Sequence, residues 1–125
     1  MSVISNSTIQ KFSLPGLVHQ TIASHKDGLE KIEVWMQTVE PGGETPVHYH
    51  DCEEVIVIIR GSGRLSVDEK TIEFGPNSTL IIPSDIVHQL VNSGPEEIFL
   101  VASFSSTPAK VSTPDGEKLA LPWQS

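Results

Sequence analysis

Several features are scarce in this sequence, and each scarcity excludes a class of protein. A single cysteine, Cys52, excludes an internal disulfide and a cysteine-rich zinc module. Basic residues are outnumbered, with eight Lys and Arg against sixteen Asp and Glu. The resulting net charge of −8 disfavours nucleic acid or an anionic membrane as the main partner. The longest apolar run, Val55–Ile59, is far too short to cross a bilayer.

Length and composition favour one globular domain. The 125 residues match the commonest domain size, and 38% apolar residues are enough for an ordinary core. The first residues show no charged segment followed by an apolar core, so we expect no secretory signal and a cytoplasmic protein. We expect a single domain over residues 1–125, with an N-terminal arm at 1–15 available to a dimer interface and a C-terminal wrap at 105–125.

The pattern along the chain predicts an all-β fold. Runs rich in Val, Ile and Thr alternate with clusters of Gly, Pro, Asn and Asp every eight to twelve positions, and no window of twelve residues carries a clean helical stripe. Nine or ten short strands in one domain predict a sandwich or barrel without free edges. The predicted strands are His19–Ser24, Ile32–Val39, Val47–Tyr49, Glu54–Arg60, Arg64–Val67, Lys70–Phe74, Thr79–Ile82, His88–Asn92 and Glu97–Phe104, with Thr8–Phe12 as a weaker candidate.

The residues that carry chemistry are concentrated between positions 42 and 54. His48 and His50 lie two positions apart, so on a strand they project from the same face, roughly 7 Å apart at the backbone. Glu54, rather than Glu53, also lies at an even position and therefore faces the same side as the two histidines. His88 is the first residue of a later predicted strand. Three neutral imidazoles and one carboxylate suit Fe, Mn, Ni, Zn or Cu. On a six-coordinate ion, two positions would stay open for water, dioxygen or substrate.

Two motifs in the chain resemble those of the cupin superfamily. The first motif is Gly-x5-His-x-His-x3–4-Glu-x6-Gly, and it is matched without a gap by Gly42, His48, His50, Glu54 and Gly61. The second is Gly-x5-Pro-x-Gly-x2-His-x3-Asn, and it is matched by Gly75, Pro83, His88 and Asn92 with two departures. Seven residues separate Gly75 from Pro83, and Asp85 replaces the turn glycine. We expect the turn to be kept, because Asp tolerates unusual backbone angles.

The resemblance implies the fold and the ligand set, but not the reaction. A small single-domain cupin is a double-stranded β-helix, or jelly-roll barrel, of two antiparallel sheets. Its metal lies inside the barrel, with His48, His50, Glu54 and His88 as the implied ligands of one divalent transition metal ion per chain. Among Fe, Mn, Ni, Zn and Cu we slightly favour Fe. The resemblance also implies a homodimer.

Three functional hypotheses follow from this site. The leading one is a metal-dependent oxygenase of the dioxygenase type, an oxidoreductase acting on a small organic molecule in the barrel, with Glu54 as metal ligand or catalytic base. The second is a non-redox metal-dependent lyase or isomerase, in which the metal polarises a carbonyl or carboxylate. The third is a small-molecule-binding or sensory cupin without turnover.

Substrate contacts depend on which face of the run 32–39 points inward, and the sequence leaves this open. If the odd positions face inward, Trp35 and Gln37 contact the substrate. If the even positions face inward, Met36 and Thr38 contact it instead. Arg60 shares the parity of Glu54 and is a candidate anchor for an anionic substrate. Candidates for an apolar pocket wall are Ile56, Ile58, Ile82, Leu90 and Phe104. Packing roles are expected for Cys52 and Tyr49, and His19 and His25 are expected to be ordinary surface or core histidines.

Overall fold

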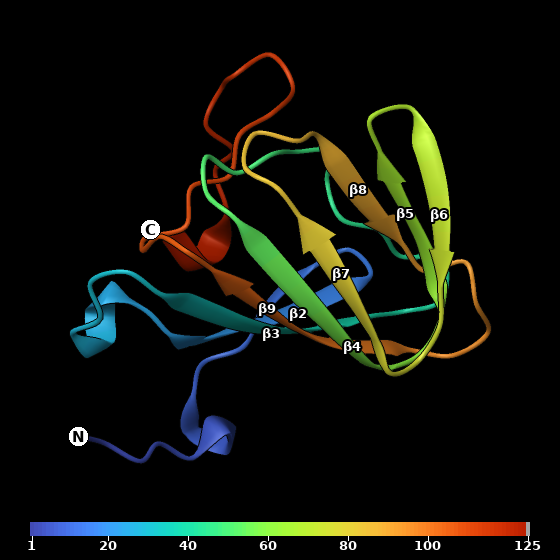
Figure 1. The fold of residues 1–125 in the computed structure, drawn as a ribbon. Coiled ribbons are helices and arrows are strands. Elements are labelled where there is room, and N and C mark those ends of the chain that lie inside the picture. The colour runs from blue at the N-terminus through green and yellow to red at the C-terminus, as the bar shows by residue number, and fades with distance from the viewer. Residues whose placement is uncertain (125) are drawn as a thin grey trace.

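The computed structural model describes residues 1–124, and it confirms an all-β jelly-roll of two antiparallel sheets (Figure 1). The larger sheet has the strand order β1-β2-β3-β9-β4-β7, and the smaller has β6-β5-β8. The strands are β1 (Phe12–Leu14), β2 (Leu17–Ala23), β3 (Glu33–Val39), β4 (Glu54–Arg60), β5 (Gly63–Val67), β6 (Lys70–Phe74), β7 (Ser78–Ile82), β8 (His88–Val91) and β9 (Ile98–Phe104). Short 3-10 helices lie at η1 (Asn6–Thr8), η2 (His25–Asp27) and η3 (Pro122–Gln124). No helix within residues 1–124 is long and apolar enough to span a bilayer.

Most predicted strands are found within one or two residues of their expected bounds, with two exceptions. The expected strand Val47–Tyr49 forms only isolated bridges, because His48 pairs with His88 while Tyr49 pairs with Ser112. Neighbouring residues that pair with different segments cannot extend into one ladder. The weak candidate Thr8–Phe12 is divided between the end of η1 and the start of β1.

The alternation of buried and exposed residues on β3 answers the question of its inward face. The odd positions of this strand are buried and the even positions are half-buried, so Trp35 and Gln37 point into the barrel. Met36 and Thr38 point to the outer face. The inner face of the sheet continues on β9, whose buried residues are Ile98, Leu100, Ala102 and Phe104.

The turns explain why the second motif departs from its pattern. The motif's own spacing leaves five residues between the glycine position and Pro83, so that position falls on Asn77, whose φ is 60°. Asp85, at the other glycine position, has a φ of 67°. Asn and Asp adopt this left-handed conformation more readily than other non-glycine residues. Both turns are therefore kept with Asn and Asp in place of glycine, while Gly75 lies two positions before the residue that needs a positive φ.

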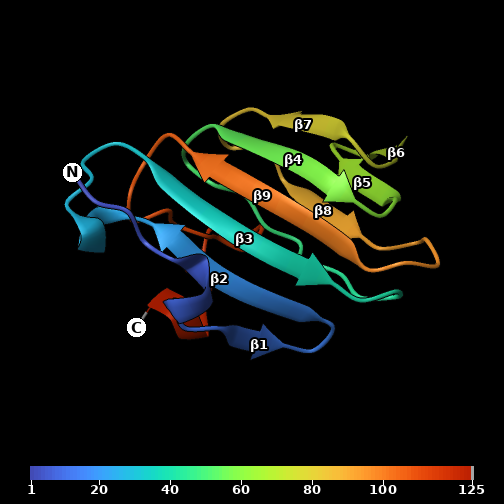
Figure 2. The same ribbon diagram turned by 90° about the horizontal axis from the view of Figure 1, so that it is seen from below.

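The two ends of the chain pack against the large sheet. The arm is held to β2 because the Gln20 amide donates to the carbonyls of Asn6 and Ile9, at 2.8 and 3.0 Å. The C-terminal tail, residues 105–124, wraps the barrel without joining a sheet (Figure 2). Within this tail, Val111, Leu121 and Trp123 are buried. The tail thereby closes one side of the barrel interior.

Candidate metal centre

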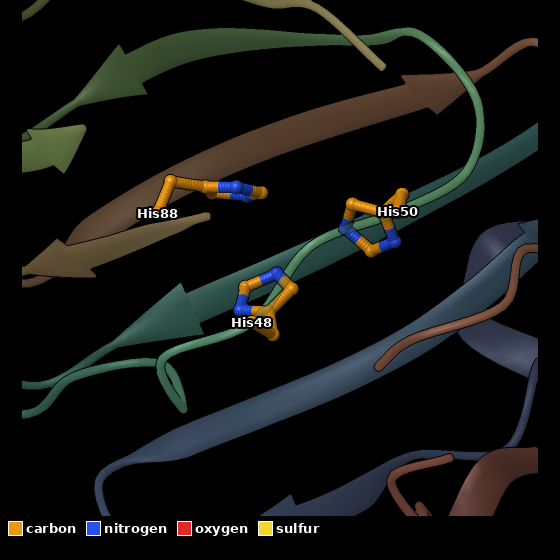
Figure 3. Close-up of side chains that lie close together, drawn as sticks. All are labelled: His48, His50 and His88. Carbon is orange, nitrogen blue, oxygen red and sulfur yellow. The ribbon is translucent and has the colours of Figure 1, made fainter. Parts of the chain in front are cut away.

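Three buried histidines from two segments meet inside the barrel (Figure 3). His48 and His50 lie on the connection from β3 to β4, and His88 is the first residue of β8. The His48 amide donates to the His88 carbonyl at 3.1 Å, and the His88 amide donates back at 2.8 Å. One nitrogen of each of the three rings lies within 4.8 Å of the others. Backbone pairing therefore brings together residues forty positions apart in the sequence.

Each of the three rings is oriented by a backbone carbonyl at Nδ1. The acceptors are Pro46 for His48 at 2.6 Å, Lys110 for His50 at 2.8 Å, and Ile86 for His88 at 2.8 Å. A carbonyl can only accept, so each Nδ1 carries the hydrogen. The neutral form of each ring then has its lone pair on Nε2. This is the usual way in which a protein orients histidines toward a metal.

A carboxylate completes the cluster from the first residue of β4. Oε1 of Glu54 lies 3.4 Å from Nε2 of His50 and 3.2 Å from Nε2 of His88. Burial raises the pKa of the Glu54 carboxyl, whereas positive charge at the His50 and His88 rings beside it outweighs burial and lowers the pKa to about 2. A proton or a metal ion at Nε2 of these rings therefore keeps the carboxylate ionised at neutral pH. Burial, followed by the neighbouring His88 and His50, lowers the pKa of His48 to about 3, so that ring is neutral.

These atoms fit a divalent metal ion. Nε2 of His50, Nε2 of His88 and Oε1 of Glu54 are buried and have no hydrogen-bond partner. Such an arrangement is costly unless a positive charge lies between the atoms. Ligand atoms held at about 2.1 Å from one ion lie roughly 3 to 4 Å apart, which is the range of the contacts to Glu54. The buried cluster of three histidines is thus consistent with one metal ion.

A narrow apolar cavity opens beside this centre. Its free volume is about 40 Å³. That volume holds about three waters. Gln37 and Thr45 are the uncharged polar residues on its wall, and the described lining contains no Lys or Arg. The apolar and aromatic lining residues are Leu14, Leu17, Trp35, Pro46, Ile56, Leu90, Leu100, Ala102, Val111, Leu119, Leu121 and Trp123.

The rings of Trp35 and Trp123 form part of the cavity wall. The His19 ring stacks on Trp123 with centroids 3.7 Å apart and meets Trp35 edge-on at 4.8 Å. Gln37 donates to Nδ1 of His19 at 2.9 Å, and Nε2 of His19 lies 2.7 Å from the Thr21 hydroxyl. His19 is therefore a fully buried core histidine with both nitrogens satisfied, and His25 is exposed.

The structure divides the expected substrate residues into two groups. Trp35 and Gln37 line the cavity, and Phe104 packs behind it against Trp35 and His50. Met36 and Arg60 do not line it, so the structure does not bring these two expected substrate residues to the cavity. Met36 lies on the outer face, where its sulfur accepts from the Asn6 amide at 3.4 Å.

Arg60 does not face the same side of the strand as Glu54, because the register of β4 against β9 shifts between Ile58 and Arg60. Its exposed guanidinium lies over the Phe99 ring instead, 5.4 Å from the centroid. Of the expected wall residues, Ile56 and Leu90 line the cavity, while Ile58 and Ile82 are buried in the core. Cys52 is buried in the core as expected, and its burial raises the pKa of the thiol.

Sequence reasoning missed the contribution of the tail and of the segment before the first histidine. Thr45 and Pro46 line the cavity, as do four tail residues, Val111, Leu119, Leu121 and Trp123. The one available signal was the spacing of Leu119, Leu121 and Trp123, which alternate as in an extended segment with one buried side. Thr45 and Pro46 lie inside the first motif, at positions that the motif leaves free.

Fold and centre together define a metal-binding cupin, and solved structures agree. A cupin-2 domain from Rhodospirillum rubrum superimposes with a TM-score of 0.75 at 19% identity, covering 90% of this chain and 80% of that one. A polyketide cyclase from Streptomyces resistomycificus gives 0.74 at 23% identity, covering 97% and 87%. At these identities the likeness establishes the fold alone.

Sequence comparison identifies a family within the cupin fold. Residues 1–121 match the family model described as auxin binding protein, so the chain belongs to the auxin-binding protein family. Auxin-binding protein 1 of Arabidopsis thaliana is 41% identical over 118 residues, covering 86% of this chain and 60% of that protein. Auxin-binding protein T85 of Nicotiana tabacum is 38% identical over 120 residues, covering 86% and 64%. The chain spans roughly three fifths of these relatives' length.

This membership overturns the leading functional hypothesis. The family and the matched relatives are named for binding auxin, and none of these names describes an oxygenase or an oxidoreductase. The expectation of a dioxygenase-type enzyme is therefore wrong. The same ligand set that suits an oxygenase also suits a centre that holds a ligand without changing it, so residue types alone do not separate the two.

Proposed function

We propose that this chain binds a small aromatic carboxylic acid of the auxin type at a metal ion held by His48, His50, Glu54 and His88, and that it does not convert this ligand. The observation that carries the proposal is the buried, unpartnered set of ligand atoms at the end of an apolar cavity. The names of the relatives supply the ligand class.

The composition of the cavity supports a ligand with one charged end. A carboxylate needs a positive partner when it leaves water, and the described lining offers no Lys or Arg. A metal ion, when bound, would supply that charge. The ring of the acid would then lie among Trp35, Leu121 and Trp123, while Gln37 and Thr45 offer hydrogen bonds.

The proposed ligand is larger than the present cavity. About 40 Å³ does not admit a bicyclic ring, so part of the wall must move outward on binding. The tail contributes Leu119, Leu121 and Trp123 to the wall, and none of these residues belongs to a sheet. We therefore assign this movement to the tail rather than to the elements that carry the metal ligands.

For the metal we propose zinc. Iron was favoured only on account of oxygen chemistry, and a centre that binds without turnover does not need a redox-active ion. Three histidines and one carboxylate are all common zinc ligands. In this role Glu54 is a metal ligand and not a catalytic base.

Calorimetric titration of the zinc-loaded chain with indole-3-acetate tests the proposal, with indole-3-acetamide as the neutral analogue. We expect the acid to bind at least ten-fold more tightly than the amide. Binding should disappear in the His48→Ala, His50→Ala double variant but persist in a His25→Ala control, because His25 is exposed and outside the cluster. The acid should be recovered chemically unchanged. Equal affinity for acid and amide, or conversion of the acid, would refute the proposal.

We also propose that the chain forms a homodimer through the outer face of the six-stranded sheet. One row across this face pairs Met36 with Val101, Val101 with Val57, and Val57 with Thr79, so it carries no charge. A sheet face open to water normally alternates polar residues, and apolar faces are typical of protein contacts. Light scattering should give twice the chain mass. Val57→Glu should shift it to the monomer, whereas Thr71→Glu on the exposed strand β6 should not.

A further inference from the structure

A second groove lies between the N-terminal arm, η2 and the C-terminal tail. Its free volume is about 550 Å³, much more than that of the metal cavity. This is within the range of sites that hold small molecules. Trp123 is the one residue that lines both spaces. The groove is thus separate from the metal centre but shares a wall with it.

Positive charge is concentrated in this groove. Lys26, Lys110 and Lys118 line it, which is half of the six lysines in a chain of net charge −8. Within residues 1–124 none of the three forms an ion pair. Their ammonium groups therefore have no counter-ion in the part of the chain that the structure describes, although the protein as a whole is strongly acidic.

The two carboxylates on the groove wall are occupied by internal donors. Asp27 accepts from the Ser24 amide at 3.0 Å and caps η2. Glu33 accepts from Nε1 of Trp35 at 2.6 Å and from the Thr107 hydroxyl at 2.9 Å. These carboxylates are held to the wall and do not pair with the lysines, so the described lining carries an excess of positive charge.

The remaining wall is largely apolar. Ile4, Ile9 and Phe12 come from the arm and β1, Ile22 from β2, and Pro108 from the tail. Unpaired cations beside apolar surface favour a ligand that joins an anionic group to an apolar body. We propose that this groove is a second binding site, distinct from the metal centre, for a small amphipathic anion such as a carboxylate or sulfonate on an apolar frame.

The groove touches the supports of the metal centre at two points. The carbonyl of Lys110 accepts from Nδ1 of His50, and Trp123 stacks on His19 at the edge of the metal cavity. A molecule in the groove therefore contacts the segment that orients one metal ligand and closes the first cavity. Because the contact of Lys110 with His50 is made by the backbone, replacing its side chain leaves that contact in place.

Titration of the zinc-loaded chain with 1-anilinonaphthalene-8-sulfonate, followed by dye fluorescence, tests this site. The test variant is Lys26→Gln, Lys110→Gln, Lys118→Gln. Its matched control carries the same change of charge at the three exposed lysines outside the groove, as Lys11→Gln, Lys31→Gln, Lys70→Gln. We expect the test variant to bind the dye about ten-fold more weakly than wild type, and the control to bind it as wild type does.

Two further titrations place the dye. A His48→Ala, His88→Ala variant should bind it with wild-type affinity, because neither ring nor its carbonyl partner belongs to the groove wall. The neutral analogue N-phenyl-1-naphthylamine should bind wild type at least ten-fold more weakly than the sulfonate. The proposal is overturned if the groove and control variants bind alike, if the metal-site variant loses the dye, or if the neutral analogue binds equally well.

Discussion

At the scale of single residues, the centre depends on how each histidine uses its two ring nitrogens. Carbonyls of Pro46, Lys110 and Ile86 hold the Nδ1 atoms, and this fixes the Nε2 atoms before any metal arrives. The parity of positions 48, 50 and 54 identifies the right side chains, although the chain bends at 51–52 and forms no continuous strand there. The carbonyl partners are not visible in the sequence, because Lys110 is sixty positions from His50.

Glu54 supplies the only negative charge among the proposed ligands. Changing it to Gln keeps the size of the side chain but removes that charge, so we expect zinc affinity to fall at least ten-fold. The control is Glu53→Gln, since Glu53 is exposed on the other side of the chain. Competition with a fluorescent zinc chelator measures both. Unchanged affinity in the Glu54→Gln variant would mean that this carboxylate is not a ligand.

His19 makes folding stability depend on pH. Its burial lowers the pKa to about 3 from an ordinary 6.5. Between pH 3 and pH 6.5, the ring is therefore protonated in the unfolded chain but neutral in the folded chain. The contribution of neutral His19 to the free energy of unfolding is complete above pH 6.5 and is lost as the pH falls toward 3. The slope is at most about 1.4 kcal/mol per pH unit.

Urea unfolding at pH 7.5 and pH 5 measures this effect. Wild type should lose more stability on acidification than His19→Gln, which cannot titrate at that position. His25→Gln is the matched control and should behave as wild type, because His25 is exposed. Equal losses in wild type and His19→Gln would show that this ring is not the source.

At the scale of elements, the turns show what spacing can and cannot predict. Gly61 has a φ of 88°, and an added Cβ would lie 2.7 Å from the Glu97 carbonyl, so the motif glycine is needed there. In the second motif, Asn77 and Asp85 take the glycine positions. The sequence predicted that Asp85 could replace the turn glycine. It assigned the other glycine position to Gly75, which has the residue type of the motif but lies two positions before the spacing that the motif requires.

The turn at Asn77 can be tested by substitution. Asn77→Gly should keep stability within about 0.5 kcal/mol, since glycine accepts a positive φ freely. Asn77→Val should cost about 1 to 2 kcal/mol, because a branched side chain is strained in the left-handed region. Thermal unfolding of the two variants gives the comparison. If Val is tolerated as well as Gly, the backbone at 77 is not left-handed.

The tail is an element that the sequence predicted only in outline. Its three prolines indicated an irregular wrap, and burial of Leu121 and Trp123 agrees with docking on the barrel. Its role as a cavity wall could not be predicted, because it depends on which end of the barrel the chain crosses. The periodicity of the sequence does not predict this path of the chain.

Removing the Trp123 side chain tests the docking of the tail. Trp123 is 8% exposed and stacks on His19, so Trp123→Ala should destabilise the fold by about 3 kcal/mol. Glu117→Ala, at an exposed tail position, should change stability by less than about 0.5 kcal/mol. Denaturant unfolding measures both. Wild-type stability in the Trp123→Ala variant would mean that the tail does not pack as described.

At the scale of the whole molecule, fold and ligand residues were predictable but the class of function was not. The two motifs, despite the departures in the second, specify the barrel and the four residues that meet in it. Whether such a centre oxidises a molecule or only holds it depends on access, on the metal and on the cavity wall. These features are set by Leu119, Leu121 and Trp123 as much as by the ligands, so the same motifs serve different functions.

The central claim is that His48, His50, Glu54 and His88 hold one metal ion. Elemental analysis of the chain purified without a metal-affinity tag tests it most directly, beside the His48→Ala, His50→Ala variant. We predict close to one equivalent of zinc per wild-type chain, and almost none in the variant, whose circular dichroism should stay that of a β-protein. Absence of metal from wild type even after reconstitution with zinc, or equal metal in the two proteins, would contradict the account.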